Sequence, residues 1–167
     1  GAVGAILAQM PGLPATGVFS ARGEVLDVME RHLQVNTAYR MRRMVVRPQQ
    51  LRPRTVEPTR RLTIEHLDQV RRLYGLWTDS HQLPGQLTDG VYYGVFAGPE
   101  LIAAAGTHAL SVRHGVAAIG NVLTHASFRG RGLASTTTTA VAQELFAQGC
   151  EEVVLNVRHG NDIALVT

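Results

Sequence analysis

Residues 119–134 read Ile-Gly-Asn-Val-Leu-Thr-His-Ala-Ser-Phe-Arg-Gly-Arg-Gly-Leu-Ala, an apolar strand pattern that runs through a glycine-alternating turn into a helix pattern. The first N–H groups of a helix are unpaired and carry partial positive charge, so they suit a phosphate. Gly130 and Gly132 lack the Cβ atoms that would hinder approach to the backbone, and Arg129 and Arg131 add positive charge. The pattern predicts a pyrophosphate cradle, with a purely structural helix cap as the alternative.

Two common phosphate-binding loops do not fit this turn. A Walker loop requires Gly-Lys-Ser/Thr, and the sequence contains no lysine. A dinucleotide fingerprint requires a third glycine, but Gly132 is followed by Leu133, Ala134 and Ser135. Both classes of nucleotide-binding protein are therefore excluded.

The elements around the turn predict an α+β domain with a mixed sheet. A helix pattern begins after Leu62, with Thr63 as its cap. Three strands joined by short turns then form an antiparallel meander, and a helix and a buried strand follow. The expected ranges are Val91–Ala97, Leu101–Leu110 and Val116–Thr124 for the meander, Gly130–Gln148 for the helix and Glu152–Val157 for the last strand. Another helix pattern starts at Asn161 and breaks off at Thr167, so we expect a longer polypeptide.

The preceding residues divide into two segments. Residues 1–47 predict a small α/β piece, with strands at Thr16–Ser20 and Tyr39–Val46 and a helix at Glu24–Leu33. Residues 48–61 are rich in proline and arginine and predict a linker without extended regular structure. The expected domain therefore spans residues 62–167.

Charge does not favour a nucleic-acid-binding protein. The net charge is +3, all cationic side chains are arginine, and half of these lie between Arg40 and Arg61. Such a cluster can mark a nucleic-acid footprint. Prolines interrupt this one within the expected linker, so a solvated connector is favoured.

Composition narrows the classes of protein to which the chain could belong. The single cysteine, Cys150, excludes an intrachain disulfide, and its neighbours Glu151 and Glu152 argue against a reactive thiol. No apolar run approaches about 18 residues, so no membrane span is predicted. We expect a cytoplasmic protein without a metal site.

The turn resembles the acetyl-CoA signature of the GNAT superfamily of N-acetyltransferases, Gln/Arg-x-x-Gly-x-Gly/Ala, whose fixed positions are filled by Arg129, Gly132 and Ala134. The resemblance extends from Leu62 to Thr167 and is closest to members related to the C-terminal domain of glycine N-acyltransferases. It implies a GNAT fold and transfer of an acetyl group from acetyl-CoA to a primary amine of a small molecule or peptide. A homodimer is compatible with it, and residues 1–47 resemble the tail of a degenerate second GNAT-like half.

The same resemblance implies roles for individual residues. Backbone groups of Val122, Leu123 and Thr124 would contact the pantetheine arm, and Asn156 would lie on a strand that splays from its neighbour. Asn161, followed by Ala164, is similar to the Asn-x-x-Ala start of a cofactor-contacting helix. The pyrophosphate would be held by Arg129, Gly130, Arg131, Gly132, Leu133 and Ala134. A tyrosine that in the family protonates the thiolate would fall one residue beyond Thr167.

The implied reaction requires a base, and the sequence offers no obvious one. Backbone N–H groups near Val122 and Leu123 would polarise the thioester carbonyl while the base takes the amine proton. Many relatives carry a glutamate on the fourth strand, but Val116–Thr124 contains no acid. His108 is the candidate base, with a structural histidine as the alternative. Tyr92 and Tyr93 are candidates for the acceptor groove, with core packing as the alternative for one of them. A non-catalytic acyl-CoA-binding or sensor module therefore stays open.

Overall fold

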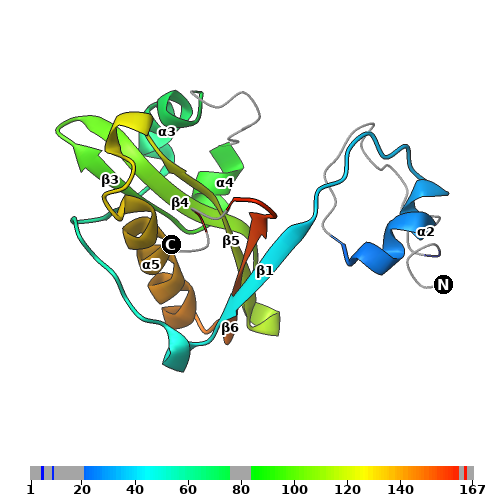
Figure 1. The fold of residues 1–167 in the computed structure, drawn as a ribbon. Helices are drawn as coiled ribbons and strands as arrows, with labels where there is room; N and C mark the ends of the chain where they lie inside the picture. The colour runs from blue at the N-terminus through cyan, green and yellow to red at the C-terminus, as the bar shows by residue number, and fades with distance from the viewer. Residues whose placement is uncertain (1–4, 6–8, 10–20, 76–83, 162–163, 165–167) are drawn as a thin grey trace. The chain divides into compact units, whose positions relative to one another are not determined.

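A mixed sheet of six strands forms the framework of the fold (Figure 1). The computed structural model describes residues 5, 9, 21–75, 84–161 and 164. The strands are β1 (Met41–Val46), β2 (Arg60–Arg61), β3 (Tyr92–Ala97), β4 (Glu100–Ser111), β5 (Val116–Thr124) and β6 (Glu152–Arg158). Their order across the sheet is β1-β6-β5-β4-β3-β2. Only β5 and β6 run parallel among these neighbours. The predicted fold class, a mixed α/β sheet, is confirmed.

Helices cover both faces of the sheet. Helix α5 (Leu133–Ala147) lies on one face, and α3 (Leu67–Tyr74) and α4 (Pro84–Asp89) lie on the other (Figure 1). Successive side chains of a strand point to opposite faces of the sheet. In β4, Ala104 packs in the core beneath α3, and its neighbour Ala105 packs in the core beneath α5. Each face therefore has its own apolar core.

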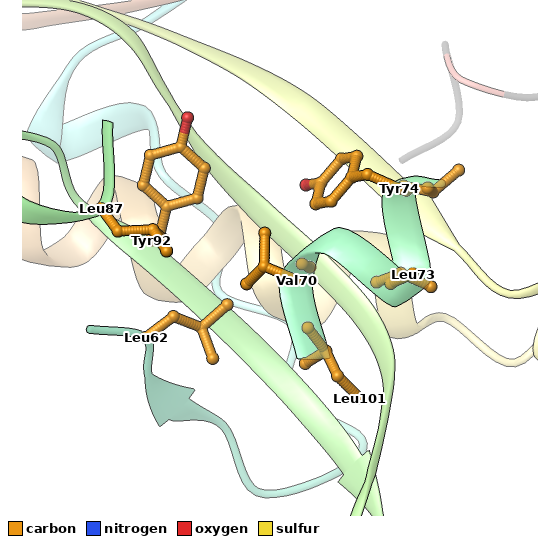
Figure 2. Close-up of a cluster of buried hydrophobic side chains, with 9 residues drawn as sticks. Leu62, Val70, Leu73, Tyr74, Leu87, Tyr92 and Leu101 are labelled. Carbon is orange, nitrogen blue, oxygen red and sulfur yellow. The ribbon is translucent and has the colours of Figure 1, made fainter. Parts of the chain in front are cut away.

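The core under α3 is the one that supports the site. Val70, Leu73 and Tyr74 of α3 lie over the strands that carry Tyr92 and Leu101 (Figure 2). Tyr92 is fully buried and Tyr74 is 3% exposed. Two polar hydroxyls are therefore held inside an apolar layer, where each requires a hydrogen-bond partner.

Strand β1, from the segment that precedes the expected linker, belongs to the main sheet. It pairs antiparallel with β6 from Met41↔Arg158 to Val46↔Val153. The chain forms two compact units, Gly1–Arg40 and Met41–Thr167. The β1–β6 ladder covers an edge of β6 that would otherwise be open. The first unit contains a 3₁₀ turn (Gly23–Val25) and α2 (Leu26–Glu30), while the expected strand Thr16–Ser20 lies outside the described residues.

The expected linker makes ordered contacts with α5. It contains a 3₁₀ turn (Pro48–Gln50) and ends in β2. The backbone N–H of Arg54 donates to Thr139 Oγ1 (3.3 Å), and that of Val56 donates to Thr136 Oγ1 (3.1 Å). A threonine run on α5 thus anchors a segment that lacks a regular backbone ladder of its own over most of its length.

The remaining elements lie close to their predicted ranges. The expected strand Val116–Thr124 coincides with β5, and Gly149, in the left-handed region with a φ of 95°, follows the end of α5. Among the described residues, no helix has both the length and the apolar character of a membrane span. Within the same residues, no cluster of three or more His, Cys, Asp or Glu side chains suits a metal ion.

Candidate functional site

The two parallel strands separate partway along their length. β5 and β6 pair from Val116↔Glu152 to Ile119↔Leu155, and the register then ends although both strands continue. Gly120–Thr124 and Asn156–Arg158 are therefore unpaired with each other. The predicted splay between these strands is present, and it opens at Gly120.

A bulge in β5 turns backbone groups away from the ladder beside this opening. Gly106 pairs with Gly120, but Ala104 pairs with Leu123, so Asn121 and Val122 together oppose Ala105. Asn121 has a φ of 51°, in the left-handed region that asparagine tolerates better than most side chains. The bulge leaves Val122, one of the two residues expected to polarise the carbonyl, without a partner on β4, whereas Leu123 pairs with Ala104.

The chain then enters α5 through the glycine turn. Gly130 and Gly132 have φ values of 76° and 79°, and a Cβ at Gly130 would meet nothing within 4 Å. The ladder of α5 begins with Thr136 N–H donating to Gly132 C=O (3.0 Å), so the amides of the preceding turn point out of the helix end. Arg129, Gly130 and Arg131 are exposed, whereas Leu133 is buried. This geometry fits an anionic phosphate group.

The two arginines of the turn are partly engaged by the protein. Arg129 Nε donates to Thr124 C=O (3.2 Å), and Arg131 lies over the Phe128 ring with its guanidinium carbon 5.0 Å from the centroid. A third arginine, Arg54 of the linker, reaches the same place. Its Nε and Nη2 lie 3.6 Å from the position of a Cβ built on Gly132. The positive charge at the start of α5 therefore comes from three arginines.

Other expected cofactor residues have partners inside the protein. Asn156 Oδ1 accepts from Arg43 Nε of β1 (3.1 Å), and Asn161 Oδ1 accepts from Ala164 N–H (3.4 Å) in the manner of a helix N-cap. Thr124 differs, because its Oγ1 is buried and has no hydrogen-bond partner within the described part of the chain. A buried hydroxyl of this kind suits a polar group of a ligand.

His108 lies at the mouth of the opening. A Cβ built on Gly120 would come within 2.3 Å of the imidazole, so the ring rests on that glycine. His108 Nε2 is 2.8 Å from Asn121 Oδ1, and Asn121 Nδ2 donates to Tyr92 Oη (2.7 Å). Tyr74 also donates its hydroxyl to the backbone carbonyl of Asn121. The candidate base is thus coupled to the bulge by hydrogen bonds.

The two tyrosine candidates for the acceptor groove point to opposite faces. Tyr92 is the core residue, and burial raises the pKa of its phenol while the Asn121 hydrogen bond partly offsets that rise. Tyr93 is half-buried on the α5 side, where Arg61 lies near its ring and burial, with Glu144 nearby, raises its pKa. Tyr92 therefore packs in the core, whereas Tyr93 packs at the margin of the cluster on the α5 side.

Two pockets lie at different distances from the site. A pocket of about 330 Å³ adjoins the turn and is lined in part by Val56, Phe128, Arg131 and Leu133. A larger one of about 500 Å³ lies against Val116 and Glu152, at the paired ends of β5 and β6. The larger pocket is therefore remote from the opening.

Asn121 and Arg54 are absent from the site residues predicted from the sequence. A polar Gly120-Asn121 pair within an apolar strand is a usable sign of a bulge. Nothing in the sequence places Arg54 near Gly132, because the two residues lie far apart along the chain.

The sheet thus splays beside a bulged strand, and the helix that follows begins at a glycine turn that suits an anionic group. The chain belongs to the acetyltransferase (GNAT) family, which residues 59–165 match. This is a family of acyl-CoA-using enzymes, and the predicted membership is confirmed.

Several solved structures share the fold. A GNAT-family protein from Novosphingobium aromaticivorans is 25% identical, with 76% of this chain and 56% of that chain covered and a TM-score of 0.58. A GCN5-related N-acetyltransferase from Kribbella flavida is 19% identical, with 81% and 54% covered and a TM-score of 0.63. AAC(6′)-Iy, in complex with the bisubstrate analogue CoA-S-monomethyl-acetylneamine, is 21% identical, with 65% and 84% covered and a TM-score of 0.53. Comparison with curated proteins gives no match. This chain spans little more than half of the length of the first two.

Proposed function

We propose that this chain is an N-acyltransferase that moves an acetyl group from acetyl-CoA to a primary amine by direct attack. The observation that carries the proposal is the meeting of three features at one place. The β5–β6 opening begins beside the bulge at Asn121, and the turn at Gly130–Gly132 follows that bulge along the same stretch of chain.

Acetyl-CoA would supply the activated thioester carbonyl. Amides at Val122 and Leu123 would polarise that carbonyl, since backbone N–H groups aimed at an oxygen stabilise developing negative charge. The turn from Arg129 to Ala134, with Arg54, would hold the phosphates. Thr124, Asn156 and Asn161 complete the proposed cofactor-binding set, with Thr124 Oγ1 the member whose hydrogen-bonding capacity is unused within the described residues.

His108 is the proposed general base. Its exposed ring lies on Gly120 at the start of the opening, where an amine could approach it. The bisubstrate analogue bound to AAC(6′)-Iy joins CoA to an amine-bearing small molecule. An acceptor of the same class, a small molecule with a primary amine, is the one proposed here. Kinship with the glycine N-acyltransferase group and assembly as a homodimer belong to the same proposal, testable by acceptor preference and by light scattering.

Calorimetry and a thiol-release assay test this function together. We expect acetyl-CoA to bind and CoA thiol to appear when a panel of primary amines is added. Absence of acetyl-CoA or CoA binding at millimolar ligand would refute the proposal. Binding without thiol release from any amine would favour a non-catalytic acyl-CoA sensor, which the lack of a carboxylate on β5 supports.

A further inference from the structure

Three side chains beside the opening form a hydrogen-bond chain with a fixed direction. At its far end, Tyr92 Oη lies 3.1 Å from the carbonyl oxygen of Thr107. A carbonyl can only accept, so the single phenolic hydrogen of Tyr92 points to Thr107. Tyr92 Oη can therefore only accept from Asn121.

The donor–acceptor order fixed at Tyr92 also fixes the orientation of the Asn121 amide. Nδ2 lies 2.7 Å from Tyr92 Oη and donates to it, which turns Oδ1 toward His108. The opposite amide orientation would set two acceptors against each other. Because Oδ1 accepts, the hydrogen in the 2.8 Å contact belongs to His108 Nε2.

We propose that Asn121 and Tyr92 are positioning residues that hold His108 as the neutral Nε2–H tautomer, leaving Nδ1 as the atom that takes the proton from the acceptor amine. This inference rests on the proposed function, and it names Nδ1 as the proton-accepting atom and Asn121 and Tyr92 as the residues that fix the tautomer. A neutral imidazole carries one ring hydrogen, so fixing it on Nε2 leaves the lone pair on Nδ1.

The surroundings hold the chain in place. Tyr92 is fully buried, and Tyr74 donates to the Asn121 carbonyl from α3. Among the described residues, the ionisable group linked to His108 through the Asn121 amide is the Tyr92 phenol, and β5 carries no ionisable side chain. Burial raises the pKa of both phenols, so both keep their hydrogens through the neutral range.

The reacting atoms then follow a balanced path. The amine nitrogen forms a bond to the thioester carbonyl carbon and gives one hydrogen to His108 Nδ1 as a proton. The carbon–sulfur bond breaks with its electron pair going to sulfur. The imidazolium returns its proton to water, and the thiolate is protonated from water, which restores neutral His108.

Two variants of Asn121 change its side-chain amide while keeping the backbone conformation of the bulge. Asn121→Gly removes the amide while retaining a residue that accepts a φ of 51°, and Asn121→Asp keeps an acceptor and also tolerates that region. Tyr92→Phe leaves the Asn121 amide free to turn, so Nδ2 can face the ring. His108→Gln assigns the histidine resonances.

Nitrogen NMR of the labelled full chain reads the tautomer without substrate or activity. We expect neutral His108 to be entirely Nε2–H in the native protein, and the Nδ1–H form to become populated in Tyr92→Phe. Asn121→Asp should raise the proton affinity of His108 about tenfold or more, because a carboxylate stabilises the imidazolium. Unchanged tautomer populations in Tyr92→Phe, or an Nδ1–H form in the native protein, would overturn the inference.

Kinetics supply the second readout. We expect kcat to fall about 10²- to 10⁴-fold in His108→Gln, the range for loss of a general base. A loss of kcat in Asn121→Gly that is smaller than in His108→Gln would support a positioning role. In Asn121→Asp, kcat should be restored and the acidic limb of its pH profile should move to higher pH. Full activity in Asn121→Gly would contradict it. Absence of CoA binding by the native chain would instead refute the proposed function, whereas the tautomer measured by NMR would be unaffected.

Discussion

Gly132 has two separate requirements, one for the fold and one for the ligand. Its φ of 79° lies where a β-branched side chain is strained, and its backbone faces the expected phosphate. In Gly132→Val we expect CoA affinity to fall at least about tenfold, because the new side chain covers the amides, together with a stability loss of about 1–3 kcal/mol from strain. Calorimetry and urea unfolding measure the two effects.

Gly149→Val is the matched control for backbone strain. Gly149 has a φ of 95° at the other end of α5, and a Cβ there would meet nothing within 4 Å. It should lose similar stability and retain CoA affinity. Equal CoA affinity in both variants would remove the turn from the binding site.

The buried phenols of Tyr74 and Tyr92 lead us to expect that the free energy of unfolding falls at alkaline pH. Burial raises the pKa of both phenols, and the Tyr92 phenol adds to the rise at Tyr74. Unfolded tyrosines ionise near pH 10, whereas these two stay protonated in the fold. Their contribution is therefore complete below pH 10 and declines as pH rises toward the raised values, by about 1.4 kcal/mol per pH unit for each tyrosine.

No lysine titrates in the same range, whereas burial also raises the pKa of Tyr93 and of Cys150, so both groups add to the decline and single variants are needed to divide it. Urea unfolding from about pH 9 to 11.5 should show the decline. Tyr74→Phe should remove part of the slope, and Tyr39→Phe, at a side chain that is 56% exposed, should leave it intact. An unchanged slope in Tyr74→Phe would contradict the assignment.

Sequence alone located the glycine turn that is proposed to hold the phosphates, but not the residues that surround it. Arg129, Gly132 and Ala134 stand at fixed spacings in one local motif, and local geometry follows from such spacing. Arg54 and the Tyr92–Asn121–His108 chain depend on tertiary packing between segments, which no local pattern encodes. The roles of both sets in binding or catalysis stay predictions.

At the level of elements, the threonine run of α5 shows how a buried helix can hold a loop. Thr136 is fully buried and accepts a hydrogen bond from Val56 N–H, while Thr137 Oγ1 bonds back to Leu133 C=O (3.1 Å) in its own helix. Thr138 Oγ1 is buried with no partner among the described residues. Neighbouring threonines thus differ in their contributions to stability.

This difference gives a test with an internal control. Thr136→Val should cost about 1–3 kcal/mol of unfolding free energy, because it leaves the Val56 N–H unpaired in a part-buried position. Thr138→Val removes a hydroxyl that bonds to nothing described, so its stability should be unchanged or slightly higher. Chemical denaturation of both variants decides the matter. Equal losses would show that the linker bond contributes nothing.

The linker also brings Arg54 to the start of α5. Arg54→Ala should weaken CoA binding about three- to tenfold at low salt, and the difference should shrink at high salt as the charge is screened. Arg52→Ala is the matched control, since Arg52 bonds to the carbonyls of Gln49 and Leu51. Titration calorimetry at two ionic strengths provides the comparison. Identical losses in the two variants would indicate a general charge effect.

Elements with strong periodicity were predictable, and those fixed by distant partners were not. The meander and α5 follow from alternation, turns and a glycine stop in the sequence. The membership of β1 in the main sheet depends on β6, which follows it by more than a hundred residues. Pairing at that separation is set by the assembled sheet rather than by the composition of either strand.

At the scale of the whole molecule, the site uses only one of the two compact units. The turn, the bulge, His108 and Arg54 all lie within Met41–Thr167, and none lies within Gly1–Arg40. Ligand binding slows amide exchange where it stabilises the native backbone. CoA should therefore protect amides in residues 120–124 and 129–136 and leave those in 21–40 unchanged.

Ligand fragments sharpen this exchange experiment. Adenosine 3′,5′-diphosphate carries phosphates but no pantetheine or thiol, so it should protect the turn at Gly130–Gly132 without protecting the bulge at Asn121. Complete CoA should protect both, because its pantetheine arm reaches the β5–β6 opening in the proposed function. Exchange measured by mass spectrometry resolves the two segments, since they fall in different peptides. Protection confined to residues 21–40, or a bulge protected equally by the diphosphate alone, would place the ligand elsewhere than along this stretch of chain.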